Sequence, residues 1–450
     1  MKLPDNLHWV FLLFSLPLVA ILAIWTPPYQ SADELAHFFR AYQVAHGRFF
    51  GGSGGFVPVA VGQLYGYASK LPFHPHERYT SSEQAEAAKV QWTDTVRYEE
   101  FPNTQEYAPT GYIPQALAIL LGQAVRASVL HTLILARMLN GGVAIALCAL
   151  SLFWCRGGKV VMFAVLLLPM TLSLFASASQ DATLICCACL AFGLISRQAD
   201  AGVSLSVCQT LVVSTSLLVM ALGRPPYALL ASALFIPGLV FRGQKIHSWV
   251  TSLVLSGSVV MVTVLWWAAY LSSTKSLAKP SPVHGVFDAK LQLINLLHHP
   301  AILIQVCESA IKQSVFVLFS TIGILGWLDT VMPFTFYLAL SLVLMVCCFA
   351  ELNRGLKIKK SLSALILTAA LFSAAGVFFI QYLIWSPVGS PVIYNLQGRY
   401  LIPLLIVGGV GLPSSDDSPK TYRYLTLIVV LAQLLTMVQL PRAIFARYYS

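Results

Sequence analysis

The segment SLSALILTAALFSAAGVFFIQYLIWSPVGSPVIYNLQG, residues 361–398, contains no charged side chain. Its first part, 361–385, is apolar and long enough, at about 1.5 Å of rise per residue, to cross the roughly 30 Å hydrocarbon core of a bilayer as one helix. Backbone polar groups in lipid must bond to one another, and a helix satisfies this within one segment. Lipid rather than water therefore decides the fold of this segment.

The composition extends this conclusion to the whole chain. Of its 450 residues, 57% are hydrophobic and 10% are charged, whereas soluble domains carry roughly 25% charged residues. A soluble protein is excluded. The net charge of +10 requires no nucleic-acid partner, because short cytoplasmic loops collect Lys and Arg. The nine cysteines lie mostly in apolar segments, which indicates neither a disulfide framework nor a zinc site.

The chain contains further apolar stretches that could form membrane-spanning helices. They are 7–27, 131–155, 160–176, 182–198, 205–222, 226–241, 247–271, 332–350, 400–412 and 424–441. With 361–385 they predict an all-α, polytopic membrane protein of eleven spans, and two ambiguous segments, 112–127 and 313–326, would raise the count to thirteen. No repeat divides the chain, so we expect a single membrane domain over 1–450.

Basic residues predict the orientation of these spans. The densest cluster, Arg354 to Lys360, is expected on the cytoplasmic side. The eleven-span arrangement also places Arg156/Lys159, Arg242/Lys245 and Lys420/Arg423 there, whereas the thirteen-span arrangement exports several basic loops and is less favoured. The large first loop, 28–110, then lies outside the cytoplasm, as does a second loop, 272–312, which we expect to cover a site at the membrane interface.

A short amphipathic helix is predicted near the start of loop 28–110, from Asp33 to Ala45. Asp33 and Glu34 fall in its first turn, where carboxylates commonly cap a helix. The pair also lies just above the lipid surface, with His37 and Arg40 one turn further along. A general base beside a phosphate-binding group is therefore the competing interpretation.

Three more polar positions interrupt apolar sequence. Asp181 breaks an apolar hairpin, and either caps the next helix or faces a site. Arg224 ends a long uncharged segment, and either reaches toward the interface or pairs with an anion. Arg399 follows the segment quoted first and stands beside Tyr400, so it is either an interface anchor or a second phosphate-binding group.

Five sequence segments, in order from residue 27 to 403, carry a resemblance to a known family. They are Pro27-Pro28 with Asp33–Tyr42 and Gly47, then Tyr107–Gln115, Ser177–Ala182, Gly326–Asp329 and Gly398–Pro403. The chain resembles a bacterial family of polytopic membrane proteins grouped with the GT-C glycosyltransferases. It departs from that pattern where Tyr29–Ala32 separate the prolines from Asp33, and where Arg224 replaces a frequent lysine.

The resemblance implies an inverting glycosyltransferase of the bacterial cytoplasmic membrane, with its site facing outward. The donor would be a polyprenyl-phosphate-linked sugar, and the acceptor a glycan such as O-antigen, or a lipid. Asp33 would be the base, and Glu34 its partner, a metal ligand or the base itself. No cofactor is certain, although Mg or Mn at Glu34 or Asp181 is a candidate. The remaining implied roles are phosphate binding by Arg224, Arg399 and Arg40, and substrate contacts by His37, Asp181, Tyr400 and Tyr107.

Elementary chemistry agrees with this division of roles. A sugar hydroxyl is a poor nucleophile and needs an aligned base, whereas a phosphate leaving group needs only cations that stabilise its growing charge. A glycoside hydrolase would need two carboxyl groups across the bond. Two alternatives remain: a transporter or flippase for a lipid-linked saccharide, which predicts inverted repeats and charges within spans, and a non-catalytic membrane scaffold.

Overall fold

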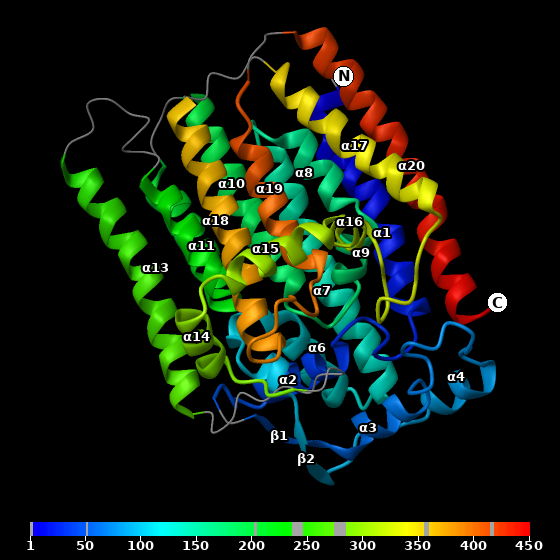
Figure 1. The fold of residues 1–450 in the computed structure, drawn as a ribbon. Coiled ribbons are helices and arrows are strands. Elements are labelled where there is room, and N and C mark those ends of the chain that lie inside the picture. The colour runs from blue at the N-terminus through cyan, green and yellow to red at the C-terminus, as the bar shows by residue number, and fades with distance from the viewer. Residues whose placement is uncertain are drawn as a thin grey trace.

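The computed structural model describes residues 3–50, 53–201, 205–235, 246–273, 285–354, 360–414 and 418–450. Within these ranges it confirms the all-α, polytopic architecture, with long helices running side by side (Figure 1). Among the described residues, seven helices are long and apolar enough to cross a membrane. They are α1 (Leu7–Trp25), α7 (Val129–Trp154), α10 (Asp181–Ala201), α13 (Ile246–Ser273), α17 (Phe334–Leu352), α18 (Lys360–Trp385) and α20 (Pro419–Tyr448).

Shorter and bent helices account for the other predicted spans. The pair α15 (Ile302–Lys312) and α16 (Ser314–Ile322) bends by 47° and gives an eighth crossing if it is one span. The predicted segment 160–176 is broken before Pro169 into α8 (Lys159–Leu166) and α9 (Pro169–Phe175), since proline starts a helix more readily than it continues one.

The predicted count of eleven therefore requires α8 with α9 and three short elements to cross as well, in addition to the seven long helices. The short elements are α11 (Val207–Gly223), η3 (Pro225–Phe235) and α19 (Ile402–Gly411), which follows η4 (Gly398–Leu401). The ambiguous segment 112–127 forms only α6 (Ile113–Ala124), about 18 Å long at 1.5 Å per residue. That length is too short for a straight crossing.

One end of the helix bundle carries the N-terminus and several basic residues, and the other end carries the first loop. The N-terminus, which begins with η1 (Leu3–Asn6), lies at the top of Figure 1, whereas the first loop covers the bottom. Arg156, Lys159, Arg354 and Arg423 gather beside the N-terminal residues Pro4 and Asp5. The side of the membrane that this end faces stays a prediction. Arg242, Lys245, Lys357 and Lys359 lie outside the described residues.

The first loop is a folded layer rather than a flexible connection. It contains α2 (Glu34–Ala45), α3 (Val59–Gly66), α4 (Ser81–Ala87), α5 (Pro102–Gln105) and η2 (Pro109–Tyr112), with the antiparallel strands β1 (Gly54–Pro58) and β2 (Val96–Glu100). Gly54 packs so closely on Glu99 that a Cβ would collide with its carbonyl, which explains why a glycine-rich segment begins a strand here.

The end of α20 fastens this layer to the bundle. Arg447 pairs with Asp329 at 2.9 Å and also donates to the carbonyl oxygens of Leu71 and Glu77 in the first loop. In the second loop, residues 274–284 lie outside the described residues, and α14 (Ala289–His298) packs against α18.

Candidate functional site

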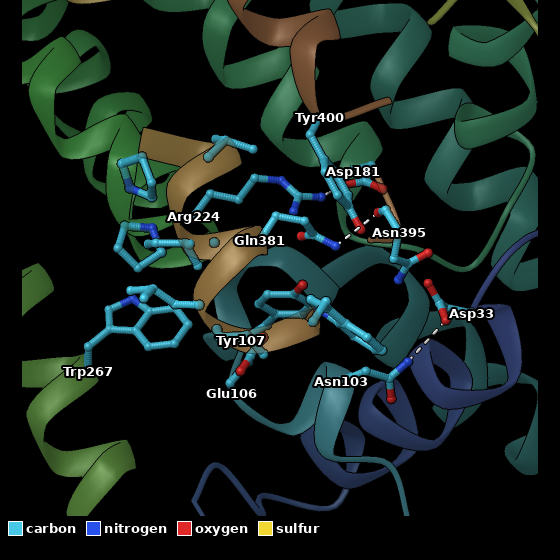
Figure 2. A pocket seen from close by; sticks show the side chains of 18 of the residues that line it. Asp33, Asn103, Glu106, Tyr107, Asp181, Arg224, Trp267, Gln381, Asn395 and Tyr400 are labelled. Atoms are coloured by element: carbon cyan, nitrogen blue, oxygen red, sulfur yellow. Dashed lines mark hydrogen bonds and ion pairs between the residues drawn. The ribbon is translucent and has the colours of Figure 1, made fainter. Parts of the chain in front are cut away.

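A cavity of about 240 Å³ lies at the loop end of the bundle, between the first loop and helices α10, α11, α13 and α18. Figure 2 shows Asp33 and Asn103 on one side of it and Trp267 on the other. Seven of the nine residues predicted from the sequence line this cavity: Asp33, His37, Tyr107, Asp181, Arg224, Arg399 and Tyr400. Segments distant in sequence therefore converge on one site.

Asp33 precedes α2 but does not cap it. Its backbone is left-handed, with φ of 62°, and its side chain makes no capping hydrogen bond, so the capping interpretation does not hold for this residue. The carboxylate instead accepts hydrogen bonds from Arg399 Nη2 at 2.6 Å and Asn103 Nδ2 at 3.1 Å. A non-glycine residue in this conformation is strained, and such strain is common where a side chain must be aimed at a site.

The ionisation of Asp33 reflects two opposed influences. Burial is the largest single influence and favours the neutral acid, but the charge and hydrogen bond of the Arg399 guanidinium, together with His37, hold the pKa of Asp33 below its ordinary value. Its side chain is 28% exposed, so the ionised group stays accessible from the cavity.

Two arginines and two aspartates form a chain of ion pairs along the cavity wall. Arg399 bonds Asp33 and lies 3.9 Å from Asp181, which pairs with Arg224 at 2.5 Å. The Tyr400 ring lies against both guanidinium groups, 4.0 Å from the Arg224 Cζ and 5.2 Å from the Arg399 Cζ. Each arginine is held in place by a carboxylate, and Arg399 Nε is buried without a hydrogen-bond partner among the described residues.

His37 completes the polar end of the cavity as a neutral group. Burial lowers its pKa to about 4, against the opposing influence of the nearby carboxylates. Its Nδ1 lies 2.7 Å from the Tyr112 hydroxyl, and its ring stacks on Tyr107. His37 is therefore a hydrogen-bonding group at physiological pH rather than a cation.

Glu34, the neighbour of Asp33, faces the opposite way. Both of its carboxylate oxygens bond the guanidinium of Arg137, at 2.8 and 2.6 Å, and Oε1 also accepts from the backbone of Ala178. The side chains of Glu34 and Arg137 are fully buried. Glu34 thus links the start of α2 to α7 through this ion pair and does not line the cavity. Its position does not fit the expected roles of base and metal ligand.

Arg40 is likewise absent from the cavity lining. Its guanidinium is buried and donates to the carbonyl oxygens of Tyr107 at 2.8 Å and Phe49 at 2.9 Å. These bonds tie two parts of the first loop to α2. We expected Arg40 to bind phosphate, but its donors already bond to backbone carbonyl oxygens. Its position instead fits a role in holding the first loop together.

The geometry offers little support for the candidate metal site. Glu34 is occupied by Arg137, and Asp181 is bound by Arg224. Over the described ranges, no group of three or more His, Cys, Asp or Glu side chains is arranged to hold a metal ion. We therefore derive no chemical step through a metal.

The rest of the cavity is mostly apolar and aromatic. Its wall there consists of Pro225, Pro226, Trp267, Tyr270, Val377, Ile380, Leu383, Ile384 and Trp385. None of these was identified from the sequence as a site residue, nor were the polar Asn103, Glu106, Gln381 and Asn395. Gln381 carried a usable signal, because it is an isolated amide near the end of an otherwise apolar span, where it donates to the Asn395 carbonyl at 2.9 Å.

Comparison with known proteins gives one match. A family model described as "Predicted membrane protein (DUF2142)" matches residues 16–407, which include all seven cavity residues named above. Neither curated proteins nor solved structures gave a match.

Proposed function

The chain belongs to the DUF2142 family of predicted membrane proteins, and we propose that it is an inverting GT-C-type glycosyltransferase of the bacterial cytoplasmic membrane. It would move a sugar from a polyprenyl-phosphate donor to a glycan or lipid acceptor on the outer face. One observation carries the proposal: an ionised carboxylate and two guanidinium groups share a cavity whose other wall is apolar.

Asp33 is the base in this mechanism. Its carboxylate takes the proton from the acceptor hydroxyl as the acceptor oxygen forms a bond to the anomeric carbon. The bond from that carbon to the phosphate oxygen breaks on the opposite face, and its electron pair stays on the phosphate. Arg224 and Arg399 stabilise the resulting negative charge, so no general acid is required.

The ion pairs of the cavity wall link donor binding to the activation of the base. A bound phosphate competes with Asp33 and Asp181 for Arg399 and Arg224. When Arg399 turns toward phosphate, Asp33 loses the cation that depresses its pKa, and its affinity for a proton rises. The base is thereby strengthened only when donor is present.

The apolar wall suits the rest of such a donor. Residues from α13 and α18, among them Trp267, Ile380 and Ile384, line the same cavity as Arg224. A prenyl chain is as apolar as this wall, so its first units can lie there while the phosphate contacts the arginines. A soluble sugar nucleotide would gain nothing from this surface.

The proposal is tested by replacing Asp33 with Asn in a strain that lacks the chromosomal copy. We expect normal abundance of the variant in the membrane, but surface glycans or glycolipids that lack one sugar by mass spectrometry, as in the deletion strain. Asp94→Asn is the matched control, because Asp94 is an exposed carboxylate of the same loop that does not line the cavity. Unchanged glycans in both the deletion strain and the Asp33→Asn strain would reject the proposal.

A further inference from the structure

A second cavity, of about 220 Å³, lies at the opposite end of the bundle from the candidate site. It is lined by Arg156, Lys159, Arg354 and Arg423, together with Pro4, Asp5, Pro419 and Tyr422. These residues come from four separate parts of the chain. Four cations therefore converge around one cavity, with a single carboxylate in its wall.

Lys159 is the most unusual member of this group. It is only 3% exposed, so its stem packs into the protein while the residue lines the cavity. A long basic side chain commonly buries its stem and keeps its charged head at an open surface. No carboxylate of the described residues forms an ion pair with Lys159, so it offers the cavity a cation that an anion could pair with.

Tyr422 gives a second, independent indication. This residue is 8% exposed, and its hydroxyl is buried without a hydrogen-bond partner among the described residues. Its ring also lies 5.7 Å from the Arg354 guanidinium. A buried hydroxyl that lines a basic cavity and lacks a partner is a donor available to a bound anion.

Carboxylates of the described residues neutralise only part of the cluster. Glu351 is committed to the backbone N–H groups of Gly158 and Val160 and to Arg354, at distances of 2.7 to 3.0 Å. Glu351 and Asp5 offset two of the four cations, so two positive charges remain among the described residues. Asp416 and Asp417 lie outside the described residues.

We infer that this cavity binds a phosphate group at the membrane face opposite the candidate site. Two sources share this chemistry: the head group of an anionic phospholipid in that leaflet, and free phosphate. Basic pockets between membrane helices are suited to such head groups. The inference is independent of the glycosyltransferase proposal, because it involves no residue of the first cavity.

The experiment uses the full-length protein in neutral detergent with three additions: phosphatidylcholine, phosphatidylcholine mixed with phosphatidylglycerol, or phosphatidylcholine with inorganic phosphate. Thermal unfolding and native mass spectrometry report binding. The variants are Arg423→Gln and Lys159→Gln, with Lys420→Gln as the matched control. Lys420 is an exposed lysine of the same helix that does not line the cavity.

We expect phosphatidylglycerol to raise the melting temperature of the wild type and to be retained as a bound lipid. Arg423→Gln should weaken this effect roughly fivefold, as expected for one lost contact to an anionic head group, whereas Lys420→Gln should not. Lys159→Gln, which also removes one cation from the cavity wall, should weaken the effect at least as much. Because Arg423 is exposed, its variant is expected to fold even if the Lys159 variant does not.

An effect of inorganic phosphate without one of phosphatidylglycerol would support the site with free phosphate as its ligand. The inference is overturned if neither addition acts beyond phosphatidylcholine alone. It is also overturned if Lys420→Gln weakens binding as much as Arg423→Gln, because the effect would then be one of general surface charge.

Discussion

Replacing Arg137 with Gln tests the buried ion pair that separates the roles of Glu34 and Asp33. Both side chains of the Arg137–Glu34 pair are fully buried, and their closest atoms are 2.6 Å apart. The substitution leaves the Glu34 charge in the interior without its cation. It also removes donors from the carbonyl oxygens of Ala23, Thr26 and Pro27 at the end of α1.

The expected loss follows from these contacts. Removing one partner of a buried ion pair costs about 3–5 kcal/mol, so Arg137→Gln should lower the free energy of unfolding by at least this amount and reduce the abundance of the protein. Asp33→Asn, at a partly exposed position, should cost much less. Unfolding in mixed detergent micelles, followed by tryptophan fluorescence, measures both.

A double-mutant cycle with Glu34→Gln makes the test specific. When both charges are absent, no unpaired charge remains, so the double variant should be less destabilised than the sum of the single variants. An Arg137→Gln variant within about 1 kcal/mol of the wild type, or strictly additive losses, would refute the reasoning, since the pair would then contribute little.

Three other perturbations have defined outcomes. Because burial holds the pKa of His37 near 4 in the folded protein, against 6.5 as the ordinary value, the unfolded state binds the extra proton first. The contribution of neutral His37 to the free energy of unfolding is therefore fully present above pH 6.5 and is lost as the pH drops toward 4, by up to about 3 kcal/mol. His37→Gln should flatten the dependence of the melting temperature on pH between 6.5 and 4. Asp329→Asn, which weakens the bond to Arg447, should speed proteolysis of the first loop. Gly398→Ala should lower the melting temperature, because a Cβ there collides with α16, whereas Gly408→Ala, which meets open space, should leave it unchanged.

The sequence allowed prediction of most of the cavity's polar residues because their surroundings are apolar. Arg224 and Arg399 each end a long uncharged segment, so a functional or anchoring role was the natural expectation. Neither residue's partner was predictable, however, because Asp181 and Asp33 are 43 and 366 residues away along the chain. Pairing at such distances depends on how the helices pack.

The adjacent Asp33 and Glu34 show a second limit. Neighbouring residues at a helix start point in different directions, and the left-handed backbone of Asp33 decides which one faces the cavity. The sequence does not encode that dihedral angle in a readable pattern. Arg137 did carry a signal, since an arginine within an apolar segment requires a partner, but its partner Glu34 lies 103 residues away.

The central claim is that Asp33, Arg224 and Arg399 surround one phosphate-bearing lipid, and cryo-electron microscopy of the full-length protein with polyprenyl phosphate tests it most directly. We predict density for the phosphate within hydrogen-bond distance of both arginines, with Arg399 turned away from Asp33 and the prenyl chain along α13 and α18. A head group bound elsewhere, with the Asp33–Arg399 and Asp181–Arg224 pairs intact, would contradict the account.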